Sequence, residues 1–208
     1  MQVLTQVALQ RLIQAGIKKL KENVDILDDI FIGYTCPEMD SDYGQTYIDD
    51  IKTWFTETKI PVVQAWSFDP TRIPVISIHL ASENEDESKA AFGDYFGPGD
   101  EEEIGIGVFT VMLDIGIHTS KNGDEVLWLY YIVSYILFKN KMIAEALGLR
   151  LHTFSASDHQ KNSAVMADNI WNRWIKFRCT VTNTWSGEPF LCIEDLEVSL
   201  EIVSSNDC

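Results

Sequence analysis

Residues Val126–Phe138 read VLWLYYIVSYILF, an apolar run of thirteen residues with one serine and no charge. A helix that crosses a bilayer needs about 20 predominantly apolar residues, so this run is too short for a span. Charged residues flank the run on both sides: Asp124, Glu125, Lys139 and Lys141. The sequence therefore predicts the central part of a buried helix, from about Asp124 to Leu147, that ends at Gly148.

The predicted helix is apolar almost all the way round. Its aliphatic stripe includes Leu129 and Val133, whereas Trp128, Tyr131 and Tyr135 fall elsewhere on the circumference. A helix of this kind is buried on more than one side. We expect the aromatic side chains to pack against the N-terminal helices or an adjacent subunit, with an aromatic cofactor pocket as the alternative.

Alternating apolar and polar residues predict strands on either side of this helix. Ile104–Thr119 alternates over its whole length, which is typical of a long strand with one buried face. Two earlier segments, 61–68 and 73–82, predict a hairpin around the turn Asp69–Arg72. Three later segments predict further strands: 149–157, Trp171–Trp185 and Leu196–Ile202.

The N-terminal region, 1–58, shows helical spacing instead. It predicts an amphipathic first helix, a short helical segment within Asp25–Gly33 and a helix from about Gln45 to Thr58. This order of elements predicts the α+β class, with a mostly antiparallel sheet packed against one long helix plus the N-terminal helices. We expect a single domain over residues 1–208.

Residues 82–103 contain nine acids and one lysine, together with three glycines and a proline. Such a segment buries little apolar area, so we predict an exposed, mobile insertion. A calcium loop is the sharper alternative, but the D-x-[DN]-x-[DN]-G ligand spacing is absent from the sequence. The acidic side chains that could contact a basic partner are Glu83, Glu85, Asp86, Glu87, Asp100, Glu101, Glu102 and Glu103.

Composition and charge limit the function. The 208 residues are 46% hydrophobic and 23% charged, as in ordinary folded proteins, and the formal net charge is -16. Such a surface repels phosphate, so sequence-specific nucleic-acid binding is not expected. The first 23 residues lack the pattern of a signal peptide, so we expect a cytoplasmic product. The cysteines have no CxxC spacing and predict reduced thiols: Cys36, Cys179, Cys192 and Cys208.

Catalytic motifs such as G-x-S-x-G, the P-loop and HExxH do not occur in the sequence. His79, His118 and His152 fall on the polar faces of predicted strands. A metal-dependent hydrolase that uses these three histidines is therefore the enzymatic alternative. A position on the polar face of a strand does not show that the three histidines lie close together. A polar sheet face that lines a subunit contact explains their positions equally well. We expect no enzyme, no metal and no cofactor.

The order of segments resembles that of the tail-terminator and related neck proteins of tailed bacteriophages. The resemblance covers roughly residues 45–186. It rests on PVVQAWSFDPTRIPVISIHLAS, the acidic insertion, FTVMLDIGIHT, the helix EVLWLYYIVSYILFKNKMIAEALGL, the phrase LRLHTFSASD and the strand IWNRWIKFRCTVTNTW. The extra N-terminal helices and C-terminal strand depart from the smaller members and leave open a distinct neck or connector protein.

The resemblance implies a virion protein of the tail or neck, assembled in the host cytoplasm, without catalysis. Its subunits would close into a hexameric ring that terminates the tail tube and offers the head its docking surface. Implied partners are other copies of the chain, the tail tube protein, a head-completion or connector protein and, in a contractile tail, the sheath protein. DNA would pass through without specific binding, and no membrane is involved. Candidate subunit-interface residues are Trp128, Tyr131, Tyr135, Trp171, Trp174 and Arg178.

A third hypothesis is a cytoplasmic adaptor whose acidic segment, 82–103, binds a basic partner. Deleting residues 83–103 while leaving every interaction intact would argue against it.

Overall fold

The computed structural model describes residues 4–35, 41–64, 73–85, 94–95, 104–120, 122–158 and 170–186. The protein has an α+β fold, whose helices and strands share one hydrophobic core. In chain order the elements are α1 (Thr5–Glu22), α2 (Ile26–Ile30), the 3-10 helix η1 (Ile32–Thr35), α3 (Ser41–Glu57), β1 (Val62–Gln64), β2 (Val75–Glu85), β3 (Asp94–Tyr95), β4 (Ile104–Thr119), α4 (Gly123–Lys139), α5 (Lys141–Ala146), β5 (Arg150–Asp158) and β6 (Trp171–Ser186).

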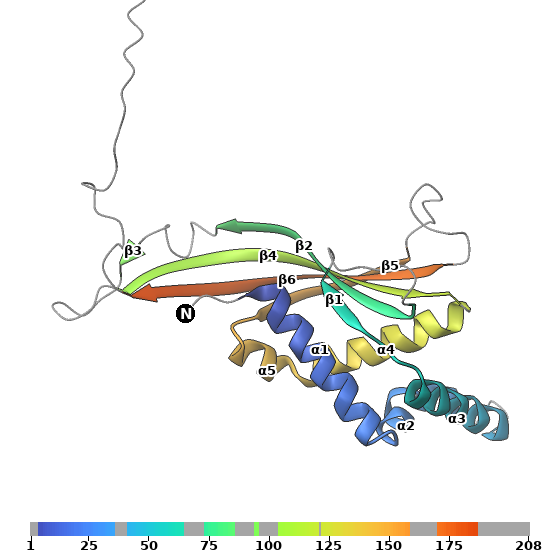
Figure 1. The fold of residues 1–208 in the computed structure, drawn as a ribbon. Helices are drawn as coiled ribbons and strands as arrows, with labels where there is room; N and C mark the ends of the chain where they lie inside the picture. Colours follow the sequence, from blue (N-terminus) through green and yellow to red (C-terminus); the bar gives the residue numbers. More distant parts are fainter. Residues whose placement is uncertain are drawn as a thin grey trace, which may run out of the picture.

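The strands form one sheet in the order β1-β2-β4-β6-β5, with β3 also paired to β4. Figure 1 shows the helices gathered on one face of this sheet. The predicted long strand is confirmed, because β4 covers Ile104–Thr119 and pairs with β6 along its whole length. All the strand pairs of the sheet are antiparallel except the pair of β1 with β2, which is parallel.

The predicted hairpin between β1 and β2 is wrong. The two strands pair in parallel, with Val62 opposite Ile76 and Gln64 opposite Ile78. Parallel neighbours require the chain to return to the same end of the sheet, and ten residues, which can span up to about 33 Å, exceed the length of the three-residue β1. The alternation pattern finds strands, but it does not give the direction of their pairing.

The predicted insertion 82–103 is wrong at its start. Ser82 to Glu85 continue β2 past a bulge and pair with β4, and Asp94 and Tyr95 form β3 on the same strand. The long strand β4 offers backbone partners even to acidic residues. Residues 86–93 and 96–103 lie outside the described residues, as does the predicted strand Leu196–Ile202.

The predicted helix from Asp124 to Leu147 is interrupted. It begins as expected, where the Asn122 side chain accepts a hydrogen bond from the backbone N–H of Glu125 (3.0 Å). It divides at Asn140, whose side chain donates to the carbonyl of Ile136 at 2.8 Å and so competes with the helical pattern. The predicted stop is confirmed, because Gly148 has φ 86° after α5.

Helix α1 crosses α4 closely at Gly16. A Cβ atom at this position would lie 2.5 Å from Cγ2 of Ile136, which is buried. The glycine therefore permits the close contact of the two helices over the core.

Candidate functional site

The three predicted histidines do not form one site. His79 and His118 both contact Ser77, whereas His152 bonds to Thr180 Oγ1 at 2.6 Å. On β6 the neighbour of His118 is Asn172, eight residues from Thr180, so about 26 Å separates the two places along the strand. Among the described residues no three His, Cys, Asp or Glu side chains come together as a metal group. The three-histidine hydrolase is therefore not supported.

Two of the histidines form a polar cluster on the sheet face opposite the helices. We call Ser77, His79, His118, Asn172 and Trp174 the Ser77 cluster. Ser77 Oγ lies 2.9 Å from His79 Nε2 and 2.8 Å from His118 Nε2, and His118 Nδ1 lies 2.5 Å from Asn172 Oδ1. The Trp174 ring packs edge-on against both imidazoles, with centroids 4.9 and 5.5 Å away. Three neighbouring strands are thereby joined through side chains.

The backbone explains why this cluster fits. Ser77 is opposite Gly116, which is opposite Trp174, and His118 is opposite Asn172. A Cβ atom at Gly116 would lie 2.6 Å from both His118 Nε2 and Ser77 Oγ. Only a glycine at this position leaves room for the two side chains to meet.

Burial lowers the pKa of His118 below its ordinary value, while the hydrogen bond that His118 donates to Asn172 opposes the shift and the charge of His79 adds to it. Burial also lowers the pKa of His79, opposed by the negative charge of Asp114. Both imidazoles therefore favour the neutral form. With His118 donating from Nδ1 to Asn172, its Nε2 accepts from Ser77, and Ser77 accepts from His79.

The contacts of Ser77, His118 and Asn172 have the order nucleophile, base and orienting group. However, Ser77 is 0% exposed and His118 is 2% exposed. A substrate carbonyl cannot reach Ser77 Oγ in this arrangement, and the serine lies within a strand instead of a sharp turn. The Ser77 cluster is therefore a hydrogen-bond network, buried at Ser77 and His118, that links β2, β4 and β6 through side chains.

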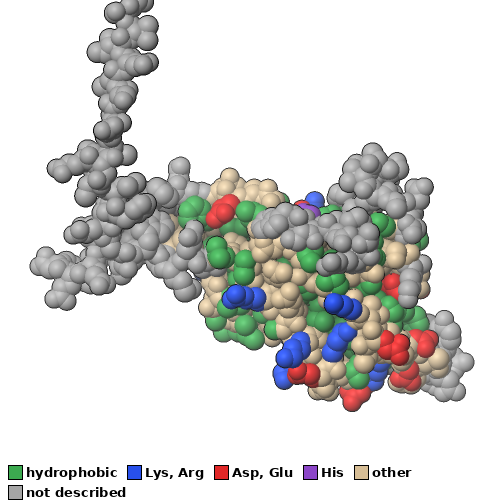
Figure 2. Space-filling view, viewed as in Figure 1, with side chains coloured by type: hydrophobic (Ala, Val, Ile, Leu, Met, Phe, Trp, Pro, Cys, Tyr) green, Lys and Arg blue, Asp and Glu red, His purple; other side chains and the backbone are tan. Residues whose placement is uncertain are grey.

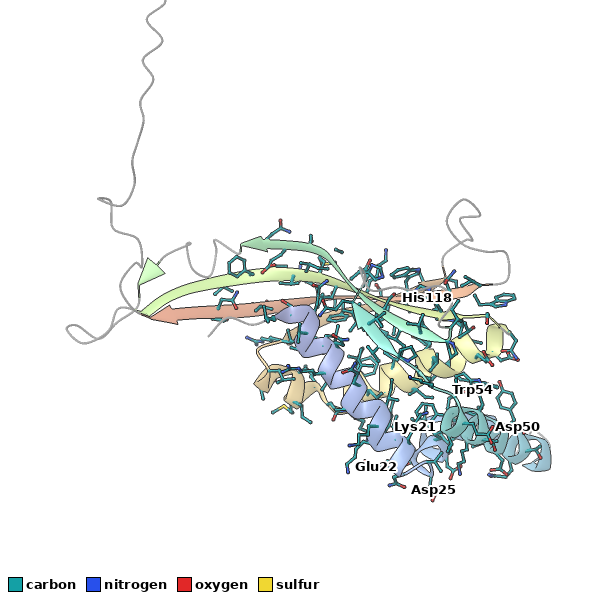
Figure 3. The ribbon with its side chains drawn as sticks, viewed as in Figure 1. Lys21, Glu22, Asp25, Asp50, Trp54 and His118 are labelled. Carbon is teal, nitrogen blue, oxygen red and sulfur yellow. The ribbon has the colours of Figure 1, made fainter. Side chains whose placement is uncertain are left out.

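The aromatic residues of α4 pack against the N-terminal helices. Trp128 is buried, and its Nε1 donates to the Tyr47 hydroxyl at 2.8 Å while its ring contacts Trp54 of α3 edge-on at 5.3 Å. The Tyr131 ring contacts Phe31 at 6.2 Å. Figure 3 labels Trp54 among the helices and His118 on the sheet. Trp128 is thus covered within the chain, whereas Tyr131 is still 44% exposed, and a role of these residues in subunit contacts stays a prediction.

The other predicted interface residues lie on β6. Trp171 is 46% exposed beside the start of α4, Arg178 is exposed on the face opposite the helices, and Trp174 is taken up by the Ser77 cluster. Of the predicted acidic residues, Glu83 is exposed in β2, and only the backbone of Glu85 is described. The remaining six lie outside the described residues: Asp86, Glu87, Asp100, Glu101, Glu102 and Glu103.

Of the four cysteines, only Cys179 lies within the described part of the chain, where it is a free, buried thiol. Burial raises its pKa to about 12, and the charge of Glu83 adds to the shift. A thiol in this state is unreactive at neutral pH and packs as a small hydrophobic group.

An exposed apolar surface lies where the sequence predicted the continuous helix. The α5 apolar surface consists of Phe138, Met142, Ile143 and Leu147, which are 63%, 76%, 51% and 38% exposed. Figure 2 shows hydrophobic side chains gathered at the place that α5 occupies in Figure 1.

No family model matches the sequence, and no curated protein matches it significantly. Within the described segments, no helix is long and apolar enough to cross a bilayer.

Proposed function

We propose that the chain is a structural protein of the bacteriophage head-tail junction, which forms a homo-oligomeric ring at the end of the tail tube. The observation that carries the proposal is the α5 apolar surface. Single exposed hydrophobic side chains are common, but four within ten residues favour a protein contact. The resemblance in the order of segments, from about residue 45 to residue 186, selects the phage neck as the place of that contact.

The charge of the protein agrees with this role. With a formal net charge of -16, the average surface repels DNA phosphates, as suits a ring through which DNA slides. The ring acts by shape: it ends the tube and offers the head, or its connector, a docking surface. The partners are other copies of the chain, the tube protein and a head-completion or connector protein.

Measurements on the purified chain and on phage particles test the proposal. Light scattering and electron microscopy of the purified full chain should give a ring of about 140 kDa, six copies of 23.6 kDa. Immunogold labelling of phage particles with an antibody against the chain should mark the neck, and loss of the gene should leave heads and tails unjoined. A chain that stays monomeric at all concentrations, with unlabelled particles, would overturn it. Labelling at the head instead of the tube end would assign it to another neck position.

A further inference from the structure

The two edges of the sheet differ in how they are covered. At one edge β1 has only three residues, and Gln10 and Gln14 of α1 donate to the carbonyl of Val62 at 2.8 and 3.2 Å. At the other edge β5 has nine residues and, among the described strands, pairs only with β6. An edge strand of this length is a template for pairing with a further strand.

Apolar groups border the β5 edge on its helix side. A pocket of about 160 Å³ opens there, and its lining includes Phe138, Phe154 and Leu151, with Lys141 beside them. Phe138 belongs to the α5 apolar surface, and its ring lies 5.0 Å from that of Phe154. A strand added at this edge would find an apolar surface below it.

The opposite face of the same edge is basic. Arg150 at the start of β5 and Arg178 on β6 are both exposed, and Lys176 lies next to Arg178 along that face. A strand that fits both faces must therefore alternate apolar residues with acids.

We propose that the C-terminal segment Leu196–Ile202 of a second copy adds to the β5 edge as an extra strand. In this segment, LEVSLEI, one parity is wholly apolar, and the other carries two glutamates. With the apolar parity on Phe138 and the pocket, Glu197 and Glu201 face Arg150 and Arg178. A single placement of the segment thus puts its apolar side chains on the apolar side of the edge and its glutamates on the basic side.

A second copy fits better than the chain's own segment. Strand β6 leaves the sheet at the end where β5 begins: Thr180 is opposite Arg150, and β6 continues for six more residues to Ser186. The C-terminal segment follows from that end. To return, that segment would have to pass around β5 and run parallel to it. A segment from a neighbour can pair in the antiparallel direction that β5 already uses with β6. Each subunit then gives one strand and receives one, which is a heterologous contact of the kind from which rings are built.

The inference deepens the proposed ring but does not depend on a virion location. Its main test changes one residue of each parity in the full chain. L200E places a charge on the apolar parity, whereas S199E places the same charge on the other parity, facing the arginines. Sedimentation velocity should show the apparent dissociation constant of L200E rising at least about tenfold, with S199E unchanged or tighter.

The acceptor side has its own matched pair. F138E should weaken association as L200E does, because Phe138 borders the pocket. I32E is the control, since Ile32 is 66% exposed on η1 and similar in exposure to Phe138. Neither substitution removes a buried group, so circular dichroism should report an unchanged fold.

A mixing experiment identifies the donor. The variants E197K/E201K and R150E/R178E should each stay dissociated, because tail and edge then carry like charges. Their mixture should assemble, since each tail meets an edge of opposite charge on the other variant. If L200E associates like the original chain, the inference fails while the ring proposal stands. If mixing restores nothing and L200E only lowers the melting temperature, the segment belongs to its own chain. If the unaltered chain is always monomeric, the inference fails, and the ring proposal fails with it when phage particles are also unlabelled.

Discussion

The two faces of the central sheet are built from alternate residues of the same strands, yet they use different chemistry. On the helix side Leu113, Ile115 and Ile117 of β4 are all 0% exposed. On the opposite side the intervening residues are Asp114, Gly116 and His118, which belong to or border a polar network. The comparison shows that one strand can carry its stability on one face and its pairing register on the other.

The helix side depends on packed volume, so its residues tolerate loss poorly. The opposite side depends on hydrogen bonds whose partners must meet at set positions. The free energy of unfolding should therefore fall most when side-chain atoms are deleted on the helix side. On the opposite side it should fall most when an added atom separates the hydrogen-bonded partners.

The largest effect is expected from deleting volume on the helix side. I115A removes a fully buried branched side chain from the centre of the core and should lower the free energy of unfolding by about 2–5 kcal/mol. D114A, one residue earlier on the other face, should change it by less than about 1 kcal/mol. Urea denaturation of both variants measures the difference. Equal losses would show that the faces do not differ in this way.

Adding a methyl group should damage the polar face next most strongly. G116A places a Cβ atom 2.6 Å from His118 Nε2 and Ser77 Oγ, so the Ser77 cluster must separate. We expect a loss of about 1–3 kcal/mol in unfolding free energy. G123A is the matched control, because its new Cβ would meet Trp171 only at 3.6 Å. A loss in G123A as large as that in G116A would argue against crowding as the cause.

The sequence predicted the α+β class and the long strand β4, because period-two alternation over sixteen residues has few other interpretations. It did not predict the parallel pairing of β1 with β2, since alternation is the same in both directions. It did not predict the helix interruption either, because Asn140 is polar at a position where a helix surface is expected. The Ser77 cluster depends on register across three strands, and the sequence alone contains no signal for register between distant strands.

The contact between α4 and α3 lies on the helix side but includes a polar bond. Y47F removes only the acceptor and should cost about 1 kcal/mol, whereas W128F removes the Nε1 donor together with part of a buried ring and should cost more. The double variant should lose less than the sum of the two, because only one bond is broken. A double-mutant cycle by urea denaturation measures this coupling. Strict additivity would mean that the hydrogen bond contributes nothing to stability.

The smallest effect distinguishes the two faces by pH. Burial lowers the pKa of His118 in the folded protein below its ordinary value of 6.5, so the unfolded chain binds more protons between those two values. The free energy of unfolding should then be unaffected above pH 6.5 and fall as the pH drops below it, by at most about 1.4 kcal/mol per pH unit for one proton. H118Q should flatten this slope between pH 7.5 and 5.5. The slope is the decisive quantity, because H118Q also loses hydrogen bonds at every pH. A slope that persists in H118Q would assign the titration to His79 or to groups outside the cluster.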